Sequence, residues 1–308
     1  MIGCATDALA KMKKYCSATL SDMAFSGLTT FGCGGKIKSV VYPRNVKGLV
    51  ACIRIATQSG MPFVVLGNGS NVLASDEYFD GVVIVTKKIC GITVKKNKVR
   101  AECGTSSAKL SSVLADNGFT GGEFLGCIPG TIGGAVVTNA GCYGQRMSSI
   151  VSSVEILQND EIRRLSADKC SFSHRKSVFC SCNAIILAVN LQLEKGEKEL
   201  CRKLAAGMMR RKKQSQPLGQ RSAGSVFYHD KLPVSKYVDK LGLKGFRIGG
   251  AAVSDKHAGF IVNVNNAKSA DVIAVMKHVK KSLVNAYGIV PQTEVRLVNF
   301  DESSISDL

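Results

Sequence analysis

The sequence predicts an α+β protein built from two or three packed units. The chain has 308 residues, which exceeds the usual length of one domain. Up to about residue 194, short apolar runs typical of strands alternate with stretches of helical periodicity. After residue 195 the pattern changes to longer helices with few strands between them. We therefore expect a boundary near residue 195, and a short, partly helical lead-in over residues 1–22.

The elements before residue 195 follow from the apolar runs and from the residues that flank them. The expected helices cover 46–57, capped by Asn45 and stopped by Gly60, and 106–116, stopped by Gly118. The expected strands cover 39–42, 62–66, 82–85 and 184–193, and hairpins are expected at 92–101 and 151–165.

The elements after residue 195 include one helix with a clear apolar face. Val272, Met276, Val279 and Leu283 share one side of the expected helix at 270–287, so that side should face a core. Ser269 is its expected cap, and Gly288 and Pro291 end it. The other expected elements are helices at 197–213 and 235–241 and strands at 259–264 and 293–298.

The chain is strongly basic. Lys and Arg outnumber Asp and Glu by 41 to 23, which gives a net charge of +18. This charge suits an anionic partner, such as nucleic acid, a membrane surface or a phosphorylated small molecule, and does not choose among them. The basic residues are spread along the chain except for a dense run at 210–213, which fits either a solvated helical face or contacts to a diphosphate.

The 12 cysteines mostly lie inside apolar runs, so we expect small buried side chains in a reducing compartment. Cys180 and Cys182 lie near Cys170 but lack the second pair that a zinc site needs, and no metal is expected. No apolar run approaches the roughly 18 residues that span a bilayer, and the N-terminus lacks the apolar core of a signal peptide. We expect a soluble, cytoplasmic protein.

A glycine-rich segment follows the expected strand at 62–66. Gly67 and Gly69 permit backbone angles that let successive N–H groups converge on a phosphate. No obvious helix follows, so the segment lacks the context of a dinucleotide-binding Rossmann fingerprint, and a tight turn is the alternative explanation. Its candidate cofactor-binding residues are Leu66, Gly67, Asn68, Gly69, Ser70, Asn71 and Val72.

A second segment, 121–135, holds six glycines in 15 residues, and NAGCYG at 139–144 adds two more. A backbone that lies flat against a large ligand needs glycine, since side chains would block the approach. Together the two segments predict a grip on both ends of one extended, pyrophosphate-containing cofactor. The candidates here are Ile128, Pro129, Gly130, Thr131, Gly133, Gly134, Asn139 and Gly141.

Four short motifs follow one another along the chain: TFGCGG at 30–35, LGNGSN at 66–71, EFLGCIPGTIGGA at 123–135 and NAGCYG at 139–144. Over residues 23–299 the chain resembles the UDP-N-acetylenolpyruvoylglucosamine reductase family. The resemblance implies FAD as cofactor and NADPH as co-substrate. It implies an FAD-binding domain of the vanillyl-alcohol-oxidase/p-cresol-methylhydroxylase type over 23–194, with two subdomains split near 87–90. Residues 195–308 would form an α+β substrate-binding domain.

Three further positions match the catalytic set of that family. By resemblance, Arg175 holds the substrate carboxylate and Ser225 donates a proton. Glu294 orients partners or, if protonated, donates to an enolate-like oxygen. For any one of the three alone, an ordinary surface, turn or strand residue is the better explanation, but within this ordered set of motifs it is not. Further candidates for substrate contact are Arg210, Lys213, Ser222 and His257.

The implied activity is NADPH-dependent reduction of UDP-N-acetylglucosamine enolpyruvate to UDP-N-acetylmuramate, in peptidoglycan precursor synthesis. The expected protein is a monomer that binds a UDP-sugar and binds neither nucleic acid nor membrane. His174 stands where related enzymes commonly have Tyr, which puts in doubt any role there that needs a phenol. The short stretch between 193 and 197 has no room for the lid insertion of one branch, so the chain resembles the lid-less branch.

Two alternatives stay open at this point. The same FAD fold could serve an oxidase of a phenol or sugar, although the combination of Arg175, Ser225 and Glu294 argues against that. A basic nucleic-acid-binding protein would place aromatic residues among its cations to stack on bases, and only 6% of residues are aromatic. A flavoprotein is yellow when purified, whereas a nucleic-acid-binding module is colourless.

Overall fold

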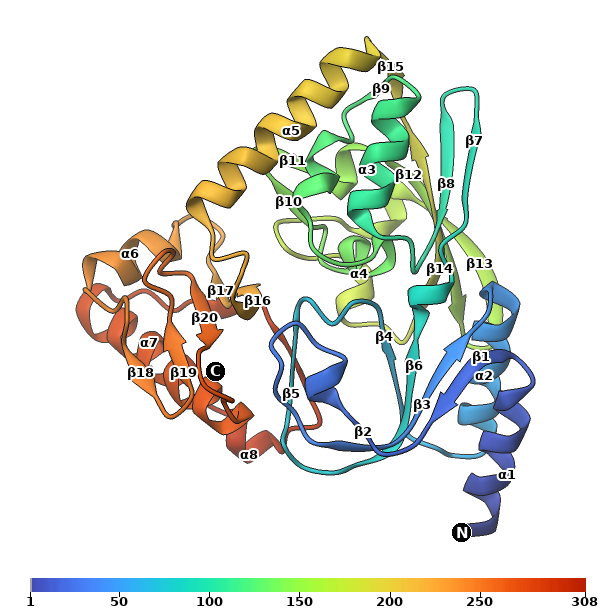
Figure 1. The fold of residues 1–308 in the computed structure, drawn as a ribbon, viewed down its shortest axis with the longest axis horizontal. Coiled ribbons are helices and arrows are strands. Elements are labelled where there is room, and N and C mark those ends of the chain that lie inside the picture. The colour runs from blue at the N-terminus through green and yellow to red at the C-terminus, as the bar shows by residue number, and fades with distance from the viewer. Residues whose placement is uncertain (1) are drawn as a thin grey trace. The chain divides into compact units, whose positions relative to one another are not determined.

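The structure, a computed structural model, describes residues 2–308 of the chain (Figure 1). These residues form two compact units, neither of which is one continuous stretch of sequence. Each unit has its own buried apolar cluster. Among the described residues, unit 1 comprises 2–20, 39–67 and 81–212, and unit 2 comprises 21–38, 68–80 and 213–308.

The two units are drawn differently from the expected domains, 23–194 and 195–308, which stay predictions, as does the split near 87–90. Residues 21–38 and 68–80 pack with the C-terminal part, and residues 195–212 pack with the first part. The expected lead-in contains helix α1 (Ile2–Lys13), as predicted. It also contains strand β1 (Cys16–Leu20), which was not predicted.

The first sheet of unit 1 has the strand order β1-β3-β6-β4. β1 runs antiparallel to β3, and β4 runs parallel to β6, so that Leu66 lies beside Val85 where both strands end. Helix α2 begins after Asn45, whose side chain accepts a hydrogen bond from the Gly48 N–H at 2.9 Å, as predicted. The bounds are β3 Lys36–Pro43, α2 Val46–Gln58, β4 Phe63–Leu66 and β6 Phe79–Val85, which confirms the helix and three strands predicted here.

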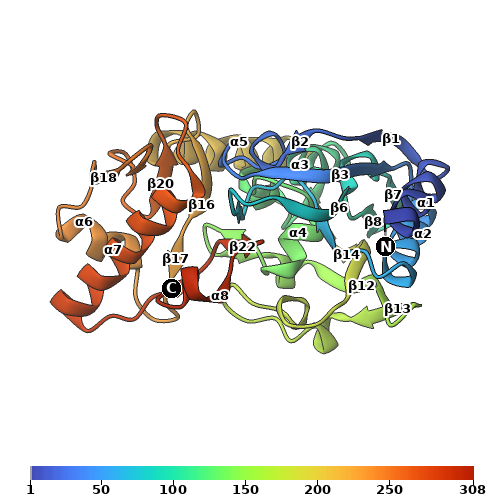
Figure 2. The same ribbon diagram turned by 90° about the horizontal axis from the view of Figure 1, so that it is seen from below.

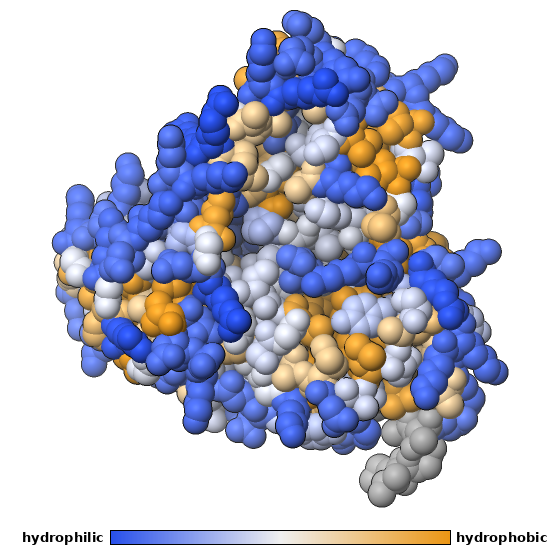
Figure 3. Space-filling model, viewed as in Figure 1, coloured by the Kyte–Doolittle hydropathy of each residue, from blue (hydrophilic) through white to orange (hydrophobic). Residues whose placement is uncertain are grey.

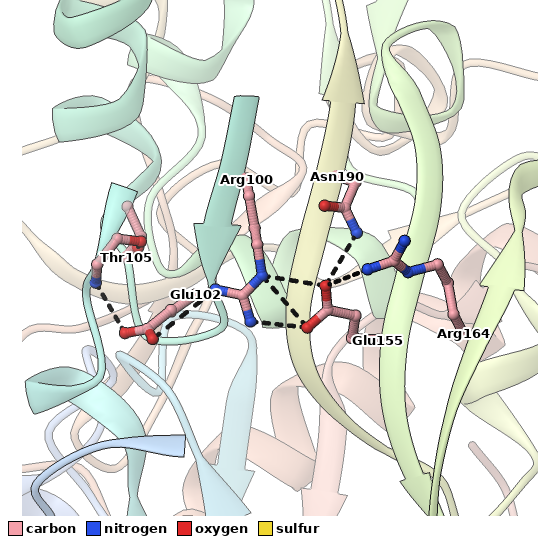
Figure 4. A network of polar contacts seen from close by, with 7 residues as sticks. Arg100, Glu102, Thr105, Glu155, Arg164 and Asn190 are labelled. Carbon is pink, nitrogen blue, oxygen red and sulfur yellow. Dashed lines mark hydrogen bonds and ion pairs between the residues drawn. The ribbon is translucent and has the colours of Figure 1, made fainter. Parts of the chain in front are cut away.

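The second sheet of unit 1 is antiparallel, in the order β13-β12-β14-β8-β7. Along β12, Val154 and Ile156 are buried, and the intervening Glu155 lies on the other face. There Glu155 accepts hydrogen bonds from Arg100 and Asn190 (Figure 4). The bounds are β7 Ile92–Lys95, β8 Lys98–Glu102, β12 Val151–Gln158, β13 Glu161–Ser166 and β14 Ile185–Gln192, which confirms both predicted hairpins and the strand at 184–193.

The helices of unit 1 include one that was predicted and one that was not. Helix α3 (Ser107–Asp116) begins after Ser106, whose hydroxyl accepts from the Lys109 N–H, and the prediction at 106–116 is confirmed. Helix α4 (Ile132–Val137) begins inside the second glycine-rich segment and packs against β14 and β8. This helix was not predicted, because the many glycines of the segment favoured a loop. The short strands are β9 Phe119–Thr120, β10 Gly141–Cys142, β11 Gln145–Arg146 and β15 Glu194–Lys195.

Helix α5 (Lys198–Ser215) confirms the prediction at 197–213. The structure describes every residue of this helix, and only Cys201 and Lys212 among them are buried. Figure 3 shows mostly hydrophilic side chains along it. No helix among residues 2–308 is both long and apolar enough to cross a membrane.

Unit 2 is built on a four-stranded antiparallel sheet in the order β16-β20-β19-β18, with α7 packed across β18, β19 and β20 (Figure 2). Two short pairs, β17-β21 and the parallel pair β22-β5, complete it, and the first residues of β3 pair with β2. The bounds are β2 Met23–Ala24, β5 Val72–Ala74, β16 Arg221–Ser225, β17 Phe227–Tyr228, α6 Val234–Lys240, β18 Arg247–Ile248, β19 Ala251–Val253, β20 Phe260–Asn263, α7 Ser269–Tyr287, β21 Gln292–Thr293, β22 Arg296–Val298 and α8 Glu302–Ile305.

Helix α7 has the predicted apolar face, since Val272, Met276, Val279 and Leu283 are all buried in the core of unit 2. Its predicted cap is wrong. Lys268 occupies the cap position, and Ser269 lies in the first turn, where its hydroxyl donates to Asp76 at 2.9 Å. The α7 end at Gly288, in a left-handed conformation, is confirmed, as are the predictions at 235–241 and 259–264.

The predicted strand at 293–298 is also wrong as one continuous element. β21 pairs with β17, and β22 pairs with β5. The chain bends at Val295, between the two short strands. The apolar pattern of the sequence shows neither partner.

Candidate functional site

The two glycine-rich segments touch each other in unit 1. A Cβ atom on Gly67 would lie 2.3 Å from the Thr131 Oγ1 atom, so any larger residue there would displace the Thr131 side chain. Gly67 directly follows β4, and Thr131 directly precedes α4. The end of a strand and the start of a helix are therefore packed together at this point.

The second segment is fixed by main-chain hydrogen bonds to the loop after β8 and to the first residue of α3. The Ser107 N–H donates to the Gly130 carbonyl at 3.1 Å, and the Ile132 N–H donates to the Thr105 carbonyl at 2.9 Å. Its last two glycines differ. A Cβ on Gly133 would press on Cys103 at 3.1 Å, whereas exposed Gly134 has only the Thr131 hydroxyl nearby, at 3.7 Å. Packing inside the protein therefore accounts for Gly133 but not for Gly134, whose contact with a cofactor stays a prediction.

The first segment continues into unit 2, where Thr30 holds it. The Thr30 N–H donates to the Gly69 carbonyl at 3.1 Å, and its hydroxyl donates to the Ser222 carbonyl at 2.7 Å. Gly69 has a φ of 63°, and a Cβ there would lie 2.5 Å from the Leu28 carbonyl oxygen. Thr30 thus joins the first segment to β16. The sequence placed Thr30 in a recognisable motif but assigned it no role.

Ser225 and Glu294 are neighbours in unit 2. The Glu294 N–H donates to the carbonyl of Val226, the residue after Ser225, at 2.9 Å. The Asn71 side-chain amide donates to the Glu294 carbonyl at 3.0 Å, and the Arg296 N–H donates to the Asn71 carbonyl at 3.0 Å. Both candidate catalytic side chains are half-buried. The structure therefore brings these two candidates and the end of the first segment together.

Arg175 belongs to unit 1, in a tight turn of the backbone. Ser173 and Lys176 exchange two main-chain hydrogen bonds, of 3.0 and 3.3 Å, and Arg175 between them has a left-handed φ of 58°. Arg175 is half-buried and His174 is exposed. A pocket of about 160 Å³ opens beside this turn, and its lining residues are Asn139, Gly141, Cys142, Gly144, Gln145, Arg146, Ser173, His174 and Arg175.

The two middle residues of the basic run at 210–213 contact the second segment and the sequence at 139–144 that follows it. The Arg211 guanidinium lies 5.0 Å from the centre of the Tyr143 ring, and buried Lys212 donates to the Cys127 carbonyl. Burial lowers the pKa of Lys212. The two residues named as candidates, Arg210 and Lys213, are exposed. Arg211 and Lys212 were not named from the sequence. Four consecutive basic residues look alike in sequence, so the pattern does not show which of them face the protein.

The remaining substrate candidates, Ser222 and His257, lie in unit 2 and are half-buried. The His257 Nδ1 atom accepts a hydrogen bond from the Gly259 N–H at 3.1 Å, so the neutral ring carries its proton on Nε2. Burial lowers the pKa of His257. A second pocket of about 450 Å³ in unit 2 is lined by Gly219, Gln220, Arg221, Asn263, Val264, Asn265 and Asn266.

Within the described residues, no cluster of His, Cys, Asp and Glu could hold a metal ion. The cysteine thiols described are all free. Two of them, Cys16 and Cys52, face each other at 3.5 Å in the core of unit 1. Burial raises the pKa of Cys142, which lines the pocket beside Arg175, to about 12.

Comparison with known proteins covers nearly the whole chain. A family model described as an FAD binding domain matches residues 37–166, and one described as the UDP-N-acetylenolpyruvoylglucosamine reductase C-terminal domain matches residues 216–298. A UDP-N-acetylenolpyruvoylglucosamine reductase of Caldicellulosiruptor saccharolyticus is 35% identical over 296 residues, which is 94% of this chain and 94% of that protein. The chain belongs to the UDP-N-acetylenolpyruvoylglucosamine reductase family.

Other members of the family agree with this assignment. The reductase of Thermotoga maritima is 38% identical over 271 residues, covering 87% of this chain and 95% of that protein. The crystal structure of the Thermus caldophilus reductase superposes with a TM-score of 0.76 at 27% identity, over 91% of this chain and 98% of that chain. Membership confirms the predicted fold class, an FAD-binding domain followed by the C-terminal domain of this family, and makes the protein a flavin-dependent oxidoreductase.

Proposed function

We propose that the protein reduces UDP-N-acetylglucosamine enolpyruvate to UDP-N-acetylmuramate, using NADPH and FAD, for peptidoglycan precursor synthesis. The observation that carries the proposal is the pair of hydrogen bonds around Glu294. They join Asn71 of the first glycine-rich segment to the carbonyl of Glu294, and the N–H of Glu294 to the residue after Ser225. Hydrogen bonds to the backbone of Glu294 thus connect a predicted cofactor segment with both predicted catalytic residues.

The residues of the two segments fit FAD. Neither LGNGSNV at 66–72 nor IPGTIGG at 128–134 contains a carboxylate, which would repel the cofactor's pyrophosphate. Their polar groups are main-chain N–H groups and neutral hydroxyls and amides, the donors that bind phosphate oxygens. Exposed Gly134 leaves the backbone open to a flat approach. FAD, when bound, supplies the hydride that NADPH has first delivered to it and that the enolpyruvyl methylene carbon accepts.

Arg175 would bind the enolpyruvyl carboxylate. Its guanidinium offers a planar fork of donors that matches two carboxylate oxygens. Negative charge grows on the carboxylate and on the carbon next to it as the methylene carbon receives hydride. A donor fixed in place before the reaction stabilises that charge without having to reorganise.

Ser225 would deliver the proton to the carbon next to the carboxylate, which completes the saturated ether. A hydroxyl is a weak acid, but the carbanion that it protonates is a strong base. Glu294 would hold Ser225 and the substrate in register or donate to the enolate-like oxygen. Arg210, Lys213, Ser222 and His257 stay proposed contacts to the UDP-sugar, and a monomeric, cytoplasmic protein stays a prediction.

One anaerobic experiment tests the function. NADPH is added to the yellow holoenzyme until the flavin absorbance is bleached, and UDP-N-acetylglucosamine enolpyruvate follows. We expect the absorbance to return with one equivalent of the substrate and UDP-N-acetylmuramate to appear by mass spectrometry. UDP-N-acetylglucosamine, which lacks the enolpyruvyl group, is the matched control and should leave the flavin reduced. A flavin that stays bleached with both compounds would refute the proposal.

A further inference from the structure

Asn139 uses both ends of its side-chain amide inside the protein. Its Nδ2 donates to the Ser173 carbonyl at 2.9 Å, and its Oδ1 accepts from the Ser148 N–H at 2.9 Å. The residue is 4% exposed and has a left-handed φ of 44°, a conformation that Asn tolerates better than most residues. Only an amide side chain of this length can donate to one segment and accept from the other.

The carbonyl that Asn139 binds belongs to the turn that carries Arg175. Ser173 opens this turn and Lys176 closes it through two main-chain hydrogen bonds. Arg175 has a left-handed φ of 58°, a strained conformation for a residue with a long side chain. Such strain persists only where the surroundings fix the backbone. Asn139 is one of the groups that fix it.

A second anchor holds the other side of the turn. The buried Ser177 hydroxyl donates to the Val137 carbonyl at 2.6 Å, and the Cys180 thiol donates to the same carbonyl at 3.1 Å. Val137 is the last residue of α4, and α4 begins directly after Thr131. One short helix therefore has the second glycine-rich segment at its start and the anchors of the Arg175 turn at its end.

We propose that Asn139 is a positioning residue that holds the Arg175 turn on the end of α4, at a fixed distance from the second glycine-rich segment. The inference rests on the proposed function for the role of Arg175. It differs from the predicted role of Asn139 in binding cofactor, since its amide is already engaged by Ser173 and Ser148. Displacement of a substrate-holding group by about 1 Å can slow a reaction by about 100-fold.

The variant Asn139→Asp removes one bond and keeps the other. A carboxylate still accepts from the Ser148 N–H, but it places an acceptor where the Ser173 carbonyl needs a donor. FAD content and the rate of flavin reduction by NADPH are measured on the same sample, so that any loss of cofactor is seen separately from the effect on the Arg175 turn. Flavin reoxidation by the enolpyruvyl substrate should slow by about 10- to 100-fold. An unchanged reoxidation rate would contradict the inference.

Asn117→Asp is the matched control, because the Asn117 amide also donates to a carbonyl at a helix end in unit 1, that of Val113 at 2.8 Å. It should change reoxidation by less than about twofold. A double-mutant cycle separates positioning from general damage. In an Arg175→Ala background, Asn139→Asp should slow reoxidation by no more than about another twofold. A full second loss there would show that Asn139 does not act through Arg175.

Hydrogen exchange of the FAD-bound protein tests the inference without any substrate. Asn139→Asp should speed exchange of the Ser173 and Lys176 amides by about tenfold or more, since their hydrogen bonds open more often. The Ser148 amide keeps its acceptor and serves as internal reference, and Asn117→Asp should leave all three unchanged. Unchanged protection in Asn139→Asp would overturn the positioning role. The two proposals can fail separately. If Asn139→Asp exchanges faster but the parent protein does not reduce the enolpyruvyl substrate, the proposed function is refuted and the positioning role of Asn139 stands.

Ser177→Ala tests the second anchor if Asn139→Asp does not retain FAD. It removes the hydroxyl bond to Val137 and should speed exchange at Ser173 and Lys176, whereas Ser181→Ala, at an exposed serine nearby, should not. Equal protection in both serine variants would count against α4 as the support of the turn.

Discussion

The side-chain amide of Asn71 donates a 3.0 Å hydrogen bond to the main-chain carbonyl of Glu294. The two residues are 223 positions apart in sequence, and the bond lies within unit 2. Through this bond Asn71, the last polar residue of the first glycine-rich segment, holds the backbone of Glu294, a proposed catalytic residue. A substitution that moves one of these residues should therefore also move the other.

Replacing Asn71 by Ala should weaken this link. The Glu294 carbonyl loses its donor, which costs on the order of 1 kcal/mol of unfolding free energy and more if water cannot replace it. We also expect slower flavin reoxidation by the enolpyruvyl substrate. Urea unfolding and stopped-flow absorbance measure the two effects. Asn285→Ala, at an exposed position of α7 in the same unit, should change neither.

Replacing Ser225 by Ala should separate the two half-reactions. The proposed proton transfer occurs only after hydride has left the flavin, so flavin reduction by NADPH should be unaffected. Reoxidation should slow by about 10²–10⁴-fold, the usual contribution of a general acid. Ser304→Ala, an exposed serine in unit 2, is the control. Parent rates of reoxidation in Ser225→Ala would remove Ser225 from the mechanism.

The carboxylate of Glu155 should make stability depend on pH. The hydrogen bond from Arg100 is the main cause that holds the pKa of Glu155 down, at about 2 against an ordinary value of 4.5. A depressed pKa stabilises the folded state above the unfolded value and loses that effect as pH falls from about 5 towards 2. Glu155→Gln should therefore lower the unfolding free energy at pH 7 by about 1 kcal/mol, allowing for screening by water.

The test for Glu155 is urea unfolding at several pH values between 7 and 3. The difference between parent and Glu155→Gln should shrink as pH falls, because the parent carboxylate becomes protonated. Asp160→Asn is the control, since Asp160 pairs with Arg54 at the surface, where its side chain is 67% exposed. A difference that stays constant with pH would show that Glu155 acts through shape and not through charge.

Lys212 and Lys213 are adjacent but should behave differently. Lys212→Ala removes a buried donor from the Cys127 carbonyl and should lower the unfolding free energy by about 1–3 kcal/mol. Lys213→Ala, at an exposed position, should change stability by less than about 0.5 kcal/mol. If Lys213 binds the UDP-sugar as proposed, the Lys213→Ala variant should have a higher KM for the enolpyruvyl substrate and an unchanged kcat. Thermal unfolding and steady-state kinetics distinguish the two residues.

Much of the fold was predictable because local signals and tertiary structure agree. The Asn45 cap, the hairpins at 92–101 and 151–165, and the apolar face of α7 all carry their cause within a few residues of sequence. The failures depend on distant partners. The strand predicted at 293–298 is broken because its two ends pair with β17 and β5, and even the nearer of these partners is 64 positions away, from Tyr228 to Gln292.

The candidate site shows the same division. The glycine-rich segments are visible in composition, but the reason for Gly67 is Thr131, a residue in the other segment. Motif order marked Arg175, Ser225 and Glu294, and nothing local marked Thr30 or the amide of Asn139 as supports of these regions. Positioning residues are defined by the carbonyl that they reach, and sequence periodicity contains no such information.

The composition of unit 2 has a consequence for how the protein is made. Phe31 and Leu73 are fully buried in the same apolar cluster as Val226 and Leu283, and β5 pairs with β22. A ribosome adds about 5–20 residues per second, so the early segments wait roughly 10–40 s for the partners that will cover them. During that interval their apolar side chains are open to chaperones or to aggregation. A circular permutant that begins near residue 213 would shorten the wait and should give a higher soluble yield.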